Sequence, residues 1–182
     1  MTPDELYQLK FPIGEFTPPA YIPTSLISTW IAIIEEFPND LKIATSNLSL
    51  TQKNWKYRPG GWSLKQIVHH CADSHVNAFI RFKLSLTENT PTIRPYFEDK
   101  WAEMIDGKDD DLKDSIGLIT SLHSKWSKLL KNLKNSDYEK TYVHPEYGKS
   151  FQLDEVIGTY AWHCQHHLTH IKLALDAEGK YD

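Results

Sequence analysis

Histidines gather in one short stretch of this chain, from Tyr160 to His170. Four of the nine histidines lie there within eight residues, at positions 163, 166, 167 and 170. Residues four apart share one face of a helix, so His163 and His167 project together and can hold one metal ion through two imidazoles. A metal site that does chemistry usually takes three protein ligands and leaves a position for water or substrate. The pair therefore needs a third ligand from elsewhere in the chain.

We expect that ligand from the other histidine cluster, which runs from His69 to His75. Read at about 100° per residue, a helix through this cluster has an apolar stripe. The stripe consists of Leu64, Ile67, Cys71, Ala78 and Phe82. His70 lies off the stripe on a polar flank, where a cavity or solvent is expected. His75 falls within the stripe and is interpreted as a hydrogen-bonded core histidine, and His69 as a helix-face residue. One site built from two helices is the prediction.

Other interpretations of the cluster are weaker. The zinc-peptidase pattern places a glutamate directly after the first histidine of the pair, but here that residue is Cys164. A structural zinc site would have four protein ligands, often cysteines. Cys71 and Cys164 each follow a candidate ligand by one residue and are therefore rotated off its helix face. A histidine-rich helix that binds no metal stays open as an alternative.

Hydrophobic periodicity predicts four long amphipathic helices that would position these side chains. Their expected starts are an N-cap at Thr24-Ser25, then Ser63, the region of Leu112, and Leu153 or Asp154. Pro38 is expected to end or kink the first helix. Residues 141–153 alternate and surround a glycine, which predicts a short two-stranded hairpin before the last helix. A bundle of such helices would direct the candidate ligands into one polar notch.

His123 lies on the inward side of the third expected helix. We interpret it first as a buried histidine with one hydrogen-bond partner, and only second as a residue near the metal.

Length and composition favour one domain over residues 1–182, with a proline-rich, non-helical arm at 1–24 and a helical bundle at 25–182. A net charge of −4 without a basic patch argues against nucleic acid as a partner. No run of about 18 apolar residues indicates a membrane segment, and no signal peptide is evident, so a cytoplasmic location is expected. The two cysteines are expected to be reduced thiols. Phe11, Ile13 and Phe16 of the arm have few partners of their own, which predicts packing on a neighbouring bundle or on a second subunit.

Several segments together resemble the YfiT branch of the DinB-like metal-dependent hydrolases, over nearly the whole chain. They are Phe11-Pro-Ile-Gly, Arg58-Pro-Gly-Gly-Trp-Ser, His69-His-Cys-Ala-Asp-Ser-His, the run from Arg81 to Tyr96, and Tyr160-Ala-Trp-His-x-x-His-His. The resemblance implies an all-α, up-down-down-up four-helix bundle, a homodimer, and one divalent ion per chain, zinc or nickel. It implies the ligands His70, His163 and His167. His70 is preferred over His69 because related sequences place the ligand eight residues after a tryptophan, here Trp62.

Three functions follow from the resemblance and the site chemistry. The first is a hydrolase in which the ion activates water. The second is an S-transferase in which the same ion deprotonates a low-molecular-weight thiol such as bacillithiol. The third is a non-catalytic, stress-related protein with a structural ion. A small-molecule substrate is expected for the first two, and Arg58, Arg81 and Arg94 are weak candidates for contacting an anionic group on it.

Overall fold

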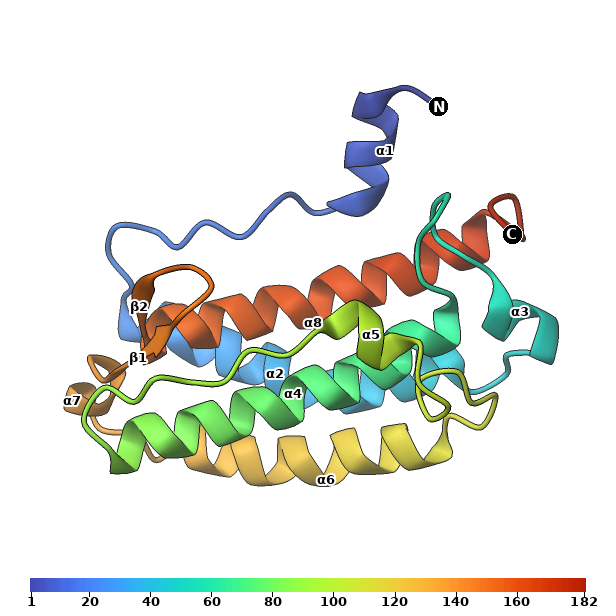
Figure 1. The fold of residues 1–182 in the computed structure, drawn as a ribbon. Coiled ribbons are helices and arrows are strands. Elements are labelled where there is room, and N and C mark those ends of the chain that lie inside the picture. Colours follow the sequence, from blue (N-terminus) through green and yellow to red (C-terminus); the bar gives the residue numbers. More distant parts are fainter.

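Four long helices form the body of the molecule in the computed structural model, which describes residues 1–182. They are α2 (Thr24–Thr45), α4 (Leu64–Thr87), α6 (Lys113–Leu130) and α8 (Leu153–Asp176). Figure 1 shows α4 and α6 running in the same direction, opposite to α2 and α8. The order is therefore up-down-down-up, and the expected all-α four-helix bundle is confirmed. Helix α4 packs against α6 and α8, and α2 packs against the same two helices.

Because α4 and α6 are parallel, the chain must travel the length of the bundle between them. Residues 88–112 make this crossover along the outside of the bundle and include the short helix α5 (Glu98–Ala102) (Figure 1). Two more short helices join the long ones: α3 (Leu50–Asn54) precedes α4, and α7 (Asn135–Tyr138) follows α6. The predicted hairpin is present as β1 (Thr141–His144) paired antiparallel with β2 (Lys149–Gln152).

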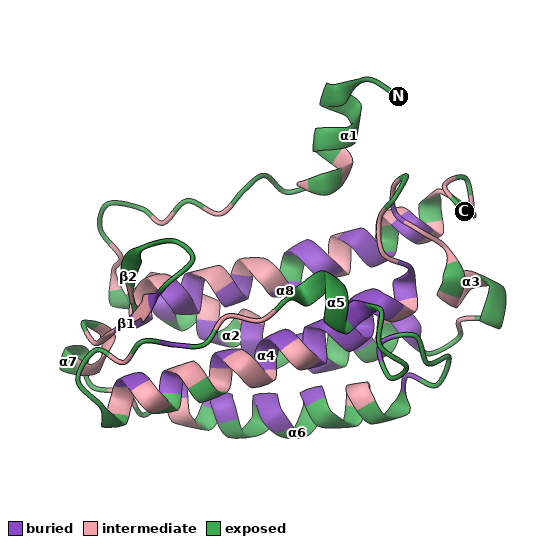
Figure 2. Ribbon diagram, in the orientation of Figure 1, coloured by how far each residue is buried: buried purple, intermediate pink, exposed green.

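The core lies between the inward faces of the four helices (Figure 2). Its largest fully buried side chains are Trp126, Phe37, Phe82, Ile34, Leu41 and Leu64. Ile34, Phe37 and Leu41 recur at three and four residues along α2, which is the spacing that predicts a helix from the sequence. No helix of the structure combines the length and apolar character needed to cross a membrane.

A side chain caps the start of α4 but not the start of α2. Ser63 caps α4 through a capping box, in which its hydroxyl accepts from the Gln66 N–H and the Gln66 side chain accepts from the Ser63 N–H. The predicted cap at Thr24-Ser25 is wrong. Pro23 is the N-cap of α2 and makes no side-chain hydrogen bond, so Thr24 already belongs to the helix.

Two further expectations need correction. Of the two outcomes expected at Pro38, an end or a kink of the first helix, the end does not occur, because α2 continues to Thr45 with Pro38 buried. The N-terminal arm is not free of helix either, since α1 spans Pro3–Lys10. A capping box between Thr2 and Glu5, with proline in the first turn, stabilises this start. The remainder of the arm turns at residues 11–14 and then runs along α8 to the start of α2 (Figure 1).

Candidate metal centre

Three imidazoles from two helices converge in the structure. His70 comes from α4, and His163 and His167 come from α8. One ring nitrogen of each lies within 4.8 Å of one ring nitrogen of the other two. The Nε2 atoms of His70 and His163 are 3.3 Å apart. Two nitrogens bound at about 2.0–2.1 Å to one tetrahedral zinc ion would be separated by about 3.3–3.4 Å. The spacing therefore fits a shared ion.

Burial keeps these imidazoles neutral. It lowers the pKa of His70 to about 3, with a smaller contribution from His166. Burial also lowers the pKa of His163 and His167 well below the ordinary value. The neutral form carries the lone pair that a metal ion requires. The Nδ1 atom of His167 is buried without a hydrogen-bond partner in the protein. The donor set fits a divalent ion.

The triad opens onto a cleft of about 410 Å³. Trp62 forms part of its wall, with its ring centroid 4.5 Å from that of His70. Arg58 and Arg81 also line the cleft, as expected for residues that contact an anionic group, whereas Arg94 does not. A larger surface hollow of about 800 Å³ lies between α1 and the C-terminal residues but contains none of the histidines. The smaller cleft is therefore the candidate site.

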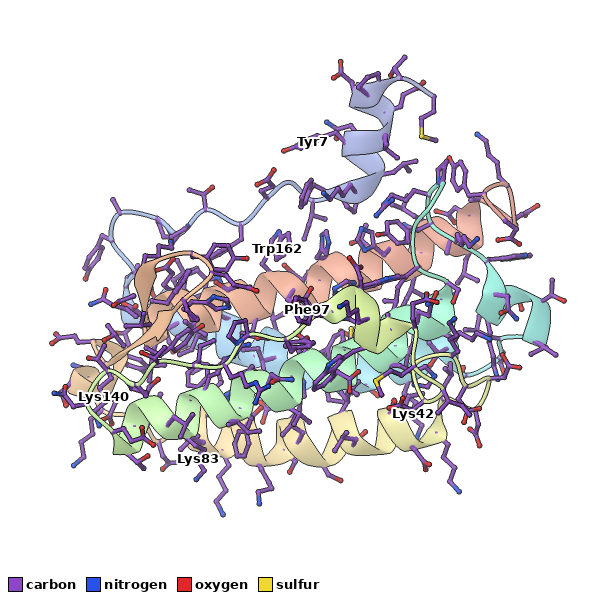
Figure 3. The ribbon with its side chains drawn as sticks, viewed as in Figure 1. Tyr7, Lys42, Lys83, Phe97, Lys140 and Trp162 are labelled. Carbon is purple, nitrogen blue, oxygen red and sulfur yellow. The ribbon has the colours of Figure 1, made fainter.

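The N-terminal arm covers one side of this cleft. The Lys10 carbonyl accepts a hydrogen bond from His170 Nε2 at 3.2 Å, and the Gly14 carbonyl accepts one from Trp162 Nε1 at 3.0 Å. Figure 3 shows Trp162 between α8 and the arm. Phe11 contacts the His166 ring at 6.1 Å between centroids.

The expectation that the arm's apolar residues pack on another bundle or subunit is corrected by these contacts. Phe16 packs edge-on against Trp30 of α2 in the same chain, with 6.1 Å between ring centroids. Ile13 stays exposed. The arm folds back on its own bundle because α8 offers it two side-chain donors and, at Gly158, room for Phe16 beside Trp30.

The other histidines of the two clusters have partners within the protein. His75 is fully buried and hydrogen-bonded, as predicted for a core histidine. His69 lies close to Ser115 Oγ and to the Asp109 carbonyl, at 2.8 and 2.9 Å, and is buried at the end of the crossover. His123 is buried and has two partners, where one was expected: the Ile34 carbonyl and His75.

A second group of histidines was missed from the sequence. His166, His167 and His170 also bring three ring nitrogens within 4.8 Å of one another. Burial lowers the pKa of His166 to about 4 and that of His170 to about 3. The four-residue spacing of His166 and His170 was the available signal, identical to that of His163 and His167. In this fold, His170 donates to the arm, and its ring stacks on Tyr57 at 3.8 Å.

The two thiols beside the candidate ligands are in the core. Cys71 and Cys164 are both fully buried and unpaired. Burial raises the pKa of each thiol above its ordinary value. Neither is therefore a reactive thiolate at neutral pH, and neither lines the cleft.

Comparison with known proteins assigns the family. The DinB superfamily model matches residues 33–171, which include all three residues of the triad. Proteins named "Putative metal-dependent hydrolase" from Bacillus cereus (strain 03BB102) and Bacillus anthracis (strain A0248) are each 48% identical to this chain over 163 residues, covering 90% of it and 93% of the relative.

A solved structure agrees in fold. YfiT from Bacillus subtilis, described as "a probable metal-dependent hydrolase with an unusual four-helix bundle topology", superposes with a TM-score of 0.90 at 42% sequence identity. The match covers 93% of this chain and 97% of that one. Sequence, fold and converging histidines agree, and the chain belongs to the DinB superfamily.

Proposed function

We propose that this protein is a metal-dependent hydrolase whose divalent ion is held by His70, His163 and His167. The observation that carries the proposal is the convergence of three neutral imidazoles on the floor of an open cleft. A purely structural ion would usually have its coordination completed by protein. The names of the relatives, which describe metal-dependent hydrolases, support the same reading.

In this proposal, different residues of the cleft bind the ion and contact the substrate. The three imidazoles hold the ion, and they need no deprotonation because burial already keeps them neutral. When bound, the ion supplies Lewis acidity, which lowers the pKa of a water molecule or thiol attached to it. Arg58 and Arg81 place positive charge in the wall, where they would orient an anionic group of a small-molecule substrate. Trp62 offers an apolar surface for its organic part.

Thiol S-transfer is the second candidate, and one observation favours it. The two arginines of the cleft match a low-molecular-weight thiol that carries carboxylates, as bacillithiol does. The thiol would have to come from a second substrate, because Cys71 and Cys164 are buried away from the cleft.

The ion itself is the first thing to test. Imidazole ligands suit zinc and nickel, and we propose one such ion per chain. Elemental analysis of purified protein should find about one divalent ion, and each of His70→Ala, His163→Ala and His167→Ala should lose it. His166→Ala is the matched control, because it removes a buried histidine of the same helix outside the triad. Retention of the ion in His70→Ala and His163→Ala, with loss in His166→Ala, would move the site to the second histidine group, which shares His167 with the triad.

The reaction needs a split assay. Metal-loaded protein is incubated with ester, amide and lactone panels without thiol, and separately with alkyl or aryl halides plus bacillithiol, glutathione or cysteine. Turnover in the first set that His163→Ala abolishes supports the hydrolase, and thiol-dependent turnover supports the transferase. If a protein that holds its ion turns over no substrate in either set, the non-catalytic, stress-related function is the one that remains.

We also propose a homodimer. Four large apolar side chains are exposed within a short segment, on α5 and the turn after it: Phe97, Trp101, Met104 and Ile105. Phe97 is labelled on this outer surface in Figure 3. Such a patch is characteristic of contact surfaces between proteins, and twofold pairing is the commonest closed arrangement. Light scattering at micromolar concentration should give twice the chain mass, and Ile105→Lys should shift it toward the monomer. A wild-type monomer would contradict the proposal.

A further inference from the structure

A row of histidines leads from the candidate metal triad into the centre of the bundle. His163 Nδ1 lies 2.9 Å from His75 Nε2, and His75 Nδ1 lies 2.7 Å from His123 Nε2. His123 Nδ1 in turn lies 2.5 Å from the carbonyl oxygen of Ile34. The three rings come from α8, α4 and α6, and the carbonyl belongs to α2. Every long helix therefore contributes one member.

The carbonyl at the inner end is available because of a proline. In an α-helix, the carbonyl of residue 34 would accept from the N–H of residue 38. Pro38 has no N–H, so the Ile34 carbonyl lacks that helical donor. A buried carbonyl without a partner is destabilising. The imidazole of His123, from α6, supplies the missing hydrogen bond.

The direction of every hydrogen bond in the row follows from this end. A carbonyl oxygen only accepts, so the proton on His123 must be on Nδ1. A neutral imidazole has one donor and one acceptor, and His123 Nε2 must then accept from His75 Nδ1–H. By the same step, His75 Nε2 accepts from His163 Nδ1–H. The Nε2 atom of His163 is left without a proton, and this is the atom 3.3 Å from His70 Nε2.

We propose that Pro38, the Ile34 carbonyl, His123 and His75 form a positioning device that fixes His163 as the Nδ1–H tautomer and presents its Nε2 lone pair to the metal ion. This inference deepens the proposed function and rests on its metal site. His75 and His123 are positioning residues and do not contact the ion. Hydrogen-bond partners of this kind orient a ligating histidine and contribute to metal affinity.

The surroundings keep the row ordered and dry. Aromatic rings enclose His75, with centroids at 5.3 Å for Phe37, 5.5 Å for Tyr160 and 6.0 Å for Trp126. Burial lowers the pKa of His123 to about 4 and that of His75 well below the ordinary value, so both rings are neutral at neutral pH. Water cannot replace a missing partner in such a layer. The tautomer of each ring is therefore set by its neighbour.

The most direct test needs no metal. Nitrogen-15 NMR of the imidazoles in chelator-treated wild-type protein near neutral pH reports which ring nitrogen carries the proton. We expect the Nδ1–H tautomer for His123, His75 and His163. The Nε2–H tautomer at any of the three would overturn the proposal, because one reversed ring breaks the sequence of donors and acceptors.

The second test measures affinity for Zn²⁺ by competition with a chromophoric chelator. His75→Leu removes the acceptor for His163 Nδ1–H and should weaken zinc binding by about 10- to 100-fold. His75→Gln keeps an amide oxygen that can accept this proton, so it should retain more affinity than the leucine variant. His69→Gln is the control, since His69 is buried on the same helix but interacts with Ser115 and the Asp109 carbonyl. It should bind zinc as the wild type does.

The outcomes separate this inference from the proposed function. Wild-type affinity in His75→Leu, or equal weakening in His75→Leu and His75→Gln, would overturn the positioning device while the metal site stands. Zinc binding with the expected order of affinities but no turnover on either substrate panel would support the device and contradict the hydrolase. A wild-type protein that binds no zinc would overturn both.

Discussion

Gly158 is the position on α8 where the packing of the N-terminal arm can be tested most sharply. A Cβ atom added there would lie 2.7 Å from Phe16 Cζ and 2.8 Å from Trp30 Cη2. Both distances are shorter than real Cβ contacts, so Gly158→Ala must displace the arm, the tryptophan ring or the helix. The glycine therefore lets Phe16 and Trp30 approach the backbone of α8 directly.

Two opposing effects set the size of the change. Replacing an interior helical glycine with alanine stabilises a helix by about 1 kcal/mol. Overpacking a well-filled contact costs about 1–3 kcal/mol. Both neighbours are rigid rings that pack edge-on against each other, so we expect overpacking to outweigh the helix propensity and Gly158→Ala to destabilise the fold by about 1 kcal/mol. For a chain of this size, that corresponds to a fall in Tm of about 2–4 °C.

Gly117 provides the matched control. It is also interior to a long helix, α6, but a Cβ added there meets nothing within 4 Å. Gly117→Ala should therefore show the helix-propensity gain alone, about 1 kcal/mol of added stability. Urea unfolding of both variants should place them about 2 kcal/mol apart on these estimates. If Gly158→Ala stabilises the protein as much as Gly117→Ala does, the close packing of Phe16 and Trp30 on α8 is refuted.

Three further predictions concern the arm, the buried histidines and the thiols. Trp162→Phe removes the hydrogen bond to the Gly14 carbonyl, which should cost about 1 kcal/mol or less and speed proteolysis within residues 11–23; an unchanged cleavage rate would contradict the anchoring role. Metal-free protein should lose stability as the pH falls from about 6.5 to 4, because His123, with its pKa lowered to about 4, gains a proton on unfolding. This one residue corresponds to about 2 kcal/mol at pH 5, and urea unfolding should show a shallower pH dependence for His123→Gln. Cys71 and Cys164 should resist a thiol reagent in the native protein and react after denaturation, and rapid native labelling would show that the core opens.

The helices and the candidate ligands were predictable because both depend on periodicity. A stripe of apolar residues at three and four positions identifies a helix and its buried face before the partners are known. The same arithmetic placed His70 on the flank of α4 and paired His163 with His167. The structure then brings the three together from α4 and α8. Local patterns were sufficient here because each statement concerned one helix.

In the N-terminal arm, the sequence contained a signal for a helix start, but the high proline content was given more weight. Pro3, with Thr2 and Glu5 around it, forms the capping box of a short helix. The high proline content of residues 1–24 suggested a non-helical arm, but proline in the first turn is compatible with a helix because no N–H is needed there. The end of α2 that was one of the two expected effects of Pro38 does not occur, for a different reason. Tertiary packing in the core holds α2 together beyond the proline, and sequence periodicity carries no measure of that packing.

The roles of His70 and His75 depend on the ring that lies between them. The two residues are five positions apart on α4, which separates them by about 7.5 Å along the helix and by about 140° around it. From the sequence, such a spacing argues for unrelated surroundings. In the structure, both contact His163: its Nε2 lies 3.3 Å from His70, and its Nδ1 lies 2.9 Å from His75. The two nitrogens of one imidazole point in different directions, so a single ring from α8 can meet both. In the proposed site, the nitrogen of His163 that a histidine faces decides whether it would hold the ion or orient His163, and that is fixed only when α4 and α8 pack together.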